Sequence, residues 1–377
     1  MQLSPEDTLK LNVLLANAQA VRINEANMSV HGLTGADEAS VKLNPTCRED
    51  QYLRLVREML ATHALGSPRG YPVYLRRWTR LGDMHNSKLQ DLLMLGEEEA
   101  VIAAARAPAV TNELARCIWW ALPRADIARY LLAKRRVAAG RLAPRLAEFL
   151  LEFLPFEAQT VNAIDTVRLV LQPGLISDVQ RDELWRRGAG KTHYYVGFLH
   201  AAANEIPDTA ADHPDRATVA ACLQHADNTF AAALLWLLSA GGQGFLATCD
   251  RVLEKPADQD VVVSLLEAMA SGLGQIRWSE AGFASVEELE SQVDNWLSTP
   301  DTATPMLADV LYSAPGLRPL LRAMIVLAYG GEPLVRPIFA RTDAIGSVMR
   351  TKIAPVTALL RGAIATLLGE RIVQPAR

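Results

Sequence analysis

The feature that most constrains the fold of this 377-residue chain is a helical pattern of apolar residues, which dominates the sequence beyond Leu81. Segments such as ELARCIWWALP and RLAEFLLEFLP place apolar side chains at i, i+3, i+4 and i+7, the spacing of one face of an α-helix. Pro or Gly interrupts the pattern about every ten to fifteen residues, so each helix is short. We therefore predict a mainly α fold built from helical hairpins.

Two helix-ending prolines are spaced like a structural repeat. Leu122-Pro123 and Leu154-Pro155 each end a predicted helix, and the two sites are 32 residues apart. A period of this length is typical of stacked helix pairs, in which each pair packs on its neighbours. The spacing predicts a solenoid-like helical-hairpin array.

The N-terminal segment predicts a capped helix. Ser4 is suited to the N-cap and Pro5 to the first helical position, because proline lacks the N–H that would be unpaired there. Five apolar residues are expected to form its buried stripe: Leu9, Leu11, Val13, Leu14 and Leu15.

A change of period from helical to alternating marks residues 20–43. Apolar residues there alternate with polar ones, which is typical of half-buried strands, and Gly32 and Gly35 mark a turn. We predict a small N-terminal β-meander. The run Thr46-Cys47-Arg48-Glu49 then fits a capping box that opens a helix extending to about His63.

Composition shifts suggest where the chain divides. Polar, Pro-containing breaks occur at 204–216 and 298–305, where few packed residues are expected. We predict an N-terminal α+β element in residues 1–85, a helical domain in 86–206 and a C-terminal helical domain in 207–377.

Charge and hydropathy narrow the class of protein. The net charge of −4 argues against generic polyanion binding, although local basic patches remain compatible with it. The start MQLSPEDTLKLNVLL shows no secretory signal, and the four cysteines form no CxxC pair. The charge-free stretch from Asn228 to Cys249 is broken at Gly241-Gly242, which predicts two short helices joined by a glycine turn. We expect a cytoplasmic protein without a membrane span.

Two glycine motifs resemble nucleotide-binding loops by letter. Gly188-Ala189-Gly190-Lys191-Thr192 resembles a P-loop, but Trp185 occupies the position of its first glycine and no apolar strand leads in. We predict that Gly188 ends one helix and Thr192 caps the next. Residues 242–247 match GxGxxA, but an Ala-rich helical run precedes them, so we predict a helix–helix turn there too.

Candidate metal and acid/base residues are sparse. Cys222 and His225 share a helical face near His213 and Asp227, which is too few ligands for a defined metal site. His193 adjoins Tyr194 and Tyr195, without an identifiable nucleophile. No HExxH or GxSxG occurs, so the sequence favours a protein without cofactor, metal or catalytic activity.

Basic and aromatic residues gather in the N-terminal half. The segment GSPRGYPVYLRRWTR suggests an anion or partner patch, because guanidinium groups bind oxyanions and aromatic rings stack. Residues 116–145 form a second basic stretch, with eight Lys/Arg against the single acid Asp126. An amphipathic helix with solvated arginines is the alternative. The patch residues are Arg69, Tyr74, Arg76, Arg77, Trp78 and Arg80.

Cys47 is the candidate reactive thiol. At the first helical position after the Thr46 cap and beside Arg48, the helix dipole would favour the thiolate, whereas Glu49 and Asp50 would oppose it. A structural cysteine is the alternative.

Five runs of the sequence carry a family resemblance: LSPEDTLKLNVLLAN, NPTCREDQYLRLVRE, GYPVYLRRWTRLGDM, EFLLEFLPFE and VRLVLQPGLI. In these runs the chain resembles the DsrS family, encoded in the dissimilatory sulfite reductase locus of sulfur-oxidising bacteria. The resemblance implies a soluble cytoplasmic accessory factor that works with sulfur-oxidation proteins beside a reverse-operating sulfite reductase. The lack of a complete catalytic constellation favours a non-catalytic role for it. The resemblance also makes Cys47 a candidate persulfide carrier. A nucleic-acid-binding regulator using the arginine-rich half is the other alternative.

Overall fold

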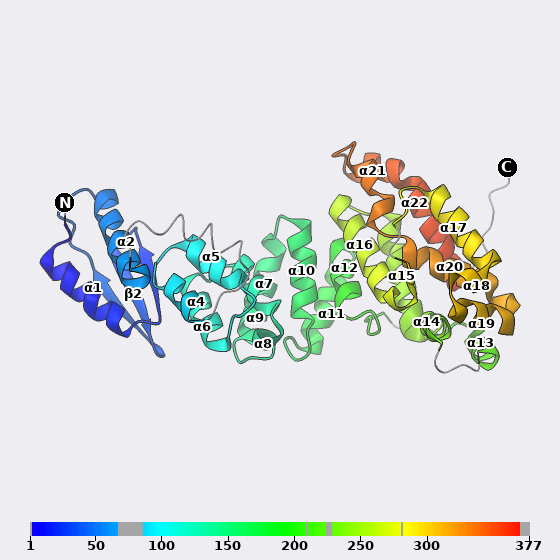
Figure 1. Cartoon of the computed structure of the whole chain (residues 1–377), viewed down its shortest axis with the longest axis horizontal. Coiled ribbons are helices and arrows are strands. Elements are labelled where there is room, and N and C mark those ends of the chain that lie inside the picture. The colour runs from blue at the N-terminus through cyan, green and yellow to red at the C-terminus, as the bar shows by residue number, and fades with distance from the viewer. Residues whose placement is uncertain (1, 67–85, 209, 224–227, 280–281, 370–377) are drawn as a thin grey trace. The chain divides into compact units, whose positions relative to one another are not determined.

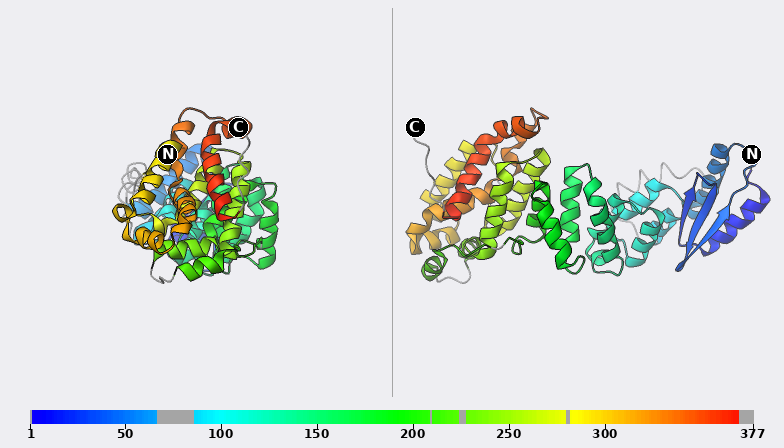
Figure 2. Two further views of the ribbon diagram at one scale, coloured as in Figure 1. Left: turned by 90° about the vertical axis from the view of Figure 1, so that its right-hand side faces the viewer. Right: turned by 180° about the vertical axis from the view of Figure 1, so that it is seen from behind.

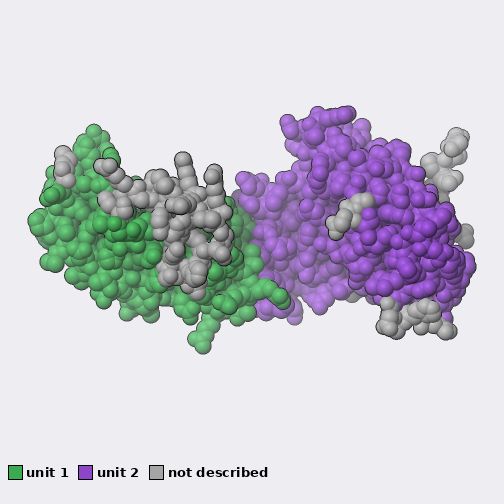
Figure 3. Space-filling view, in the orientation of Figure 1, with its two compact units in different colours: residues 1–155 green, residues 156–377 purple. Residues whose placement is uncertain are grey.

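The computed structural model describes residues 2–66, 86–208, 210–223, 228–279 and 282–369 (Figure 1). They form two compact units, residues 1–155 and 156–377 (Figure 3). The boundary follows Leu154-Pro155, one of the two predicted helix ends. The division at 85/86 and 206/207 stays a prediction.

The first unit contains a small sheet followed by short helices. Its described helices and strands are α1 (Pro5–Asn17), β1 (Ala20–Asn24), β2 (Ser29–Thr34), β3 (Asp37–Lys42), α2 (Glu49–Leu65), α4 (Asn86–Leu93), α5 (Glu98–Arg106), α6 (Asn112–Ala121), α7 (Ala125–Leu132), α8 (Arg135–Ala138) and α9 (Ala143–Phe153). The predicted N-terminal β-meander is confirmed, and the predicted helical character holds beyond it.

Helix α1 starts as its sequence predicts. The Ser4 side chain accepts a hydrogen bond from the Asp7 N–H at 3.1 Å, and Pro5 is the first helical residue. The predicted stripe was too wide, because Leu9 and Val13 are 66% and 61% exposed. Only one face of α1 packs on the rest of the unit, so Leu11, Leu14 and Leu15 alone of that stripe are buried.

The three strands form an antiparallel sheet in the order β1-β2-β3 (Figure 2). Gly32 was predicted to lie in a turn, but it lies within β2, between Val21 and Ala39 of the neighbouring strands. A Cβ at Gly32 would come within 2.9 Å of Leu14 Cδ1, so the glycine lets α1 approach the sheet. The turn is made by Gly35, whose φ of +64° suits glycine.

The start of α2 differs from the predicted capping box. The helix begins at Glu49, with Arg48 at the N-cap position and no side-chain cap. Cys47 packs against the core shared by α1, the sheet and α2. The chain therefore still contacts that core at Cys47, and the helix starts after it.

The regular elements in the described part of the second unit are three short 3-10 helices, at 274–276, 315–317 and 332–334, and its α-helices. The α-helices are α10 (Thr160–Val170), α11 (Asp178–Arg187), α12 (Thr192–Ala201), α13 (Arg216–Cys222), α14 (Thr229–Leu237), α15 (Ala240–Glu254), α16 (Gln259–Gly272), α17 (Val286–Ser298), α18 (Pro300–Ala303), α19 (Pro305–Ser313), α20 (Arg318–Tyr329), α21 (Arg336–Phe339) and α22 (Gly346–Leu367). The closest helix packing joins α10 to α12 and α20 to α22. The whole fold is mainly α-helical, as predicted.

Within the described ranges, no single helix has both the length and the apolar character needed to cross a membrane. Two bent helix pairs reach that length only when taken together. One pair is α14 with α15, bent by 71°, and the other is α19 with Pro315–Tyr329, bent by 112°. The first pair covers the charge-free stretch seen in the sequence.

Candidate functional site

The predicted arginine-aromatic patch lies outside the described residues. This applies to Arg69, Tyr74, Arg76, Arg77, Trp78 and Arg80. The patch therefore stays a prediction.

Cys47 is half-buried and does not occupy a helix start. It precedes the first residue of α2 by two positions and packs against the N-terminal core, while Arg48 pairs with Asp50 at 3.2 Å. The predicted place of Cys47 at the first helical position is therefore wrong, because the helix begins two residues later. A persulfide role for Cys47 stays a prediction.

The P-loop-like segment is a turn between two helices, as predicted. Helix α11 is capped by Ser177 and ends at Arg187, with Gly188 at its C-cap position. A Cβ at Gly188 would lie 2.4 Å from Tyr195 Cε1, so the glycine permits close packing of α12. The predicted capping role of Thr192 was wrong, because Thr192 is already helical and Lys191 holds the N-cap position.

The GxGxxA-like glycines lie inside a helix and not in the predicted helix–helix turn. Ser239 caps α15 by accepting a hydrogen bond from the Gly242 N–H at 3.3 Å, so Gly242 and Gly244 belong to its first turns. The bend between α14 and α15 precedes these glycines and lies at Leu238, the C-cap of α14. With helices on both sides, these glycines lack the strand-turn-helix setting of a dinucleotide site.

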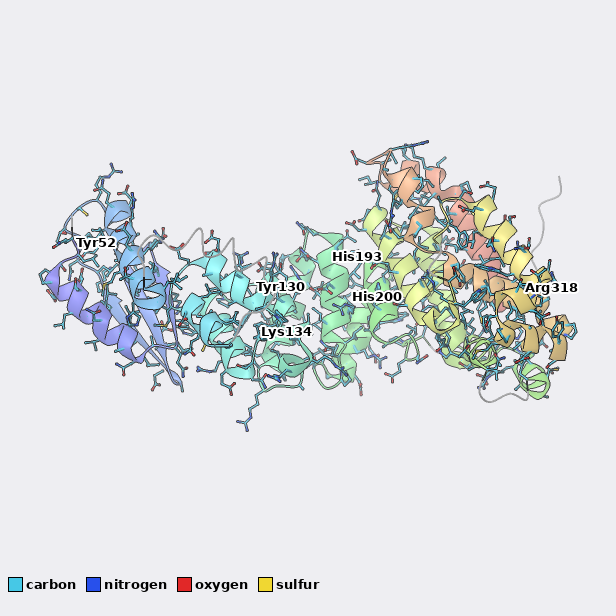
Figure 4. The ribbon with its side chains drawn as sticks, in the orientation of Figure 1. Tyr52, Tyr130, Lys134, His193, His200 and Arg318 are labelled. Carbon is cyan, nitrogen blue, oxygen red and sulfur yellow. The ribbon has the colours of Figure 1, made fainter. Side chains whose placement is uncertain are left out.

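The candidate His193 and a second histidine of the same helix, His200, are both held in structural contacts. His193 and His200 lie on α12 (Figure 4). Burial lowers the pKa of His193, and the Lys191 ammonium lowers it further, while its ring contacts Tyr194 edge to face. His200 Nε2 lies 2.9 Å from the Ser264 carbonyl oxygen. Both rings are half-buried and are held by contacts with neighbouring residues.

The group of possible metal ligands near His213 is only partly described. His213 is buried, and its Nδ1 accepts a hydrogen bond from the Asp215 N–H at 3.1 Å. His225 and Asp227 lie outside the described residues. The residues that are described contain no group of three His, Cys, Asp or Glu that could hold a metal ion.

A cavity in the first unit brings together arginines and tryptophans from separate segments. Its volume is about 620 Å³. We call it the arginine–tryptophan pocket, and it is lined by Arg22, Leu33, Gly35, Ala36, Arg116, Trp119, Trp120, Pro123 and Arg145. Its size is within the range of small-molecule sites, about 300–1,000 Å³.

Three elements place the charged side chains of this pocket. Arg22 comes from β1, Arg116 from α6 and Arg145 from α9. Helix α6 packs on β1, and its Thr111 side chain caps it by accepting from the Leu114 N–H at 3.3 Å. The positive-φ turn at Gly35 forms part of the rim. The pocket thus depends on the packing of a helix against the sheet.

Arg22 is neutralised by Glu38. Its guanidinium donates to both Glu38 oxygens, at 2.9 and 3.0 Å, and lies 4.7 Å from the Trp120 ring centroid. Burial opposes ionisation of Glu38, but hydrogen bonds from Trp120, Arg22 and His31 together hold its pKa below the ordinary value. The network fixes the Trp120 indole, whose Nε1 donates to Glu38 at 3.0 Å.

Arg116 and Arg145 are not neutralised by any described carboxylate. The half-buried Arg116 donates only to neutral oxygens, the Gly35 carbonyl at 2.6 Å and Gln19 Oε1 at 2.5 Å. Arg145 is exposed and pairs with no described residue. The pocket therefore holds two uncompensated guanidinium charges next to an indole surface.

The sequence divides its charge unevenly between the two units. Residues 1–155 contain 20 Lys/Arg and 17 Asp/Glu, a net charge of +3, whereas residues 156–377 contain 18 and 25, a net charge of −7. The excess of the first unit comes from the segment 67–85, which lies outside the described residues, so the positive charge of the pocket comes from its own arginines.

The second unit contains a contrasting cavity of about 540 Å³. Its Arg216 forms an ion pair with Asp212 at 2.7 Å, and both residues line the cavity. Because this pair is internally neutralised, the cavity lacks the positive charge of the arginine–tryptophan pocket.

The sequence signal for the pocket was partial. The basic stretch 116–145 contains Arg116 and Arg145, but sequence reasoning singled out neither them nor Arg22 as site residues. Arg22 is about a hundred residues away in the chain and reaches the pocket only through strand pairing and helix packing.

The chain matches no protein family, no curated protein and no solved structure. The resemblance to the DsrS family therefore stays a prediction.

Proposed function

We propose that this protein is a non-catalytic accessory factor of cytoplasmic sulfur oxidation, which acts by binding through the arginine–tryptophan pocket. The pathway comes from the resemblance to the DsrS family, and the mode of action comes from the pocket. Its partners would be proteins that work beside the reverse dissimilatory sulfite reductase.

The chemistry of the pocket lining carries the proposal. Two uncompensated guanidinium groups, Arg116 and Arg145, can hold an anionic group. None of the nine described lining side chains is a nucleophile or a general acid/base that titrates near neutral pH. Such a lining recognises a ligand and releases it unchanged.

The helical part suits a scaffold for such recognition. We propose that the short helices stack as a solenoid-like array of hairpins, as the 32-residue spacing of Pro123 and Pro155 predicts. The packing of α10 on α12 and of α20 on α22 supports this, since helices close in sequence lie against each other.

Affinity isolation of the tagged full-length protein from cells oxidising reduced sulfur tests the proposal. Sulfur-oxidation proteins should be recovered with the wild type and lost with Arg145→Ala. Arg136→Ala is the matched control, since Arg136 is an exposed arginine of the same basic stretch outside the pocket. Recovery of no sulfur-pathway protein would refute the pathway role, and undiminished recovery with Arg145→Ala would refute recognition by the pocket.

A further inference from the structure

We infer that the arginine–tryptophan pocket binds a phosphate monoester carried on a planar ring, the chemistry of a mononucleotide. The inference rests on the proposed binding role of this pocket and names the class of its ligand. It makes the accessory factor responsive to a small molecule.

Charge matching favours a phosphate monoester. Arg116 and Arg145 contribute two positive charges that no described carboxylate neutralises. A phosphate monoester carries about −1.5 to −2 at pH 7 and offers three acceptor oxygens, so one group can engage both guanidinium groups. A single carboxylate, as on an acidic peptide side chain, would leave one of them unpaired.

The tryptophans favour a planar ring beside the phosphate. Trp120 is half-buried and lines the pocket, and Arg22 covers its ring at 4.7 Å from the centroid. Trp119 is 6% exposed and makes a T-shaped contact with Phe149, with 4.9 Å between the ring centroids, so its position in the lining is fixed. Bases stack on such aromatic surfaces in many single-strand and nucleotide sites.

Two of the three arginines are already oriented. Hydrogen bonds to Gly35 and Gln19 hold Arg116, and Glu38 holds Arg22. Because these two side chains are already ordered, they lose little conformational entropy when a ligand binds. Arg145 has no described partner and can turn onto the phosphate. The cavity of about 620 Å³ leaves room for a ring, a sugar and one phosphate.

Titration of the full-length protein with AMP, followed by calorimetry and tryptophan fluorescence, tests the inference. Adenosine and inorganic phosphate serve as the two half-ligands. We expect AMP to bind at least about tenfold more tightly than either, because stacking and charge pairing act together. Arg145→Ala should weaken AMP binding about tenfold or more, and Arg136→Ala should leave it unchanged.

Several results would overturn the inference. They are absent AMP binding at millimolar concentration, equal binding of AMP and inorganic phosphate, and unchanged binding by Arg145→Ala. Binding of a 5′-phosphorylated single-stranded oligonucleotide without binding of AMP would also overturn it, and would indicate a nucleic-acid site.

The two proposals fail separately. If AMP does not bind but partner recovery still depends on Arg145, the ligand class is wrong and the accessory role stands. If AMP binds and no sulfur-pathway protein is recovered, the pocket chemistry stands and the pathway role is wrong.

Discussion

Two glycines in the first turns of α15 should respond in opposite directions to the same substitution. A Cβ at Gly242 would lie 2.1 Å from the Trp236 carbonyl oxygen and 2.5 Å from Leu237 Cα. Both atoms belong to the main chain at the end of α14, so they cannot move aside by a rotamer change. A Cβ at Gly244 would have its nearest neighbour at 3.5 Å, the Asp208 carbonyl oxygen, which is ordinary van der Waals contact.

The expected magnitudes follow from helix propensity and packing. Gly→Ala in a helix gains up to about 1 kcal/mol. Overpacking a filled site costs about 1–3 kcal/mol, and the upper end applies to Gly242 because backbone must shift. We expect Gly242→Ala to lose about 2 kcal/mol net and Gly244→Ala to gain about 0.5–1 kcal/mol.

Thermal unfolding of the full-length protein measures the difference. For a unit of this size, about 1 kcal/mol corresponds to about 2–4 °C, so the two variants should differ in the Tm of the second unit by roughly 5–12 °C. Equal shifts of the two variants, or a higher Tm for Gly242→Ala, would refute the close approach of α14 and α15 from which the magnitudes were derived.

Three further predictions concern buried or networked groups. Tyr52→Phe removes the hydroxyl donor from the buried Asp7 carboxylate and should destabilise the first unit by about 2 kcal/mol in chemical denaturation. Glu38→Gln should be less stable than wild type at pH 7, because the folded protein holds the pKa of Glu38 below its ordinary value. The difference in stability should vanish as pH falls below 4.5 through that folded-state pKa, and denaturation midpoints measured across pH check this. Alkylation of the native protein, read by mass spectrometry, should label the exposed Cys222 and spare Cys249, because burial raises the pKa of the Cys249 thiol.

Local patterns predicted the elements that depend on nearby residues. The Ser4 cap of α1 and the helix end at Gly188 are both decided within one helical turn, and both were confirmed. Predictions that required knowing which face is covered were less accurate. Leu9 and Val13 fit the apolar pattern of α1, yet nothing described packs on their side of the helix.

Glycines illustrate the same limit. Gly32 and Gly242 were expected in turns, because glycine often marks a break in the chain. In the structure each lies inside a regular element, where another segment approaches too closely for a side chain. The sequence shows that a glycine is present, but the reason for it lies in the partner that packs against it.

The arginine–tryptophan pocket was predictable only in part. The basic stretch that supplies Arg116 and Arg145 is visible as a charge pattern. Whether each guanidinium charge is neutralised is not visible in the sequence. In the structure Arg22 is neutralised by Glu38, whereas Arg116 donates only to neutral oxygens.

The amino-acid sequence alone determined the mainly helical class, the N-terminal β-meander and the helix ends set by local caps, since these follow from periodicity and short-range hydrogen bonds. Tertiary structure decided which apolar faces are buried, where glycines are required and which guanidinium groups remain uncompensated. Those properties depend on contacts between segments far apart in the chain, such as β1 with α6, and no local pattern encodes them.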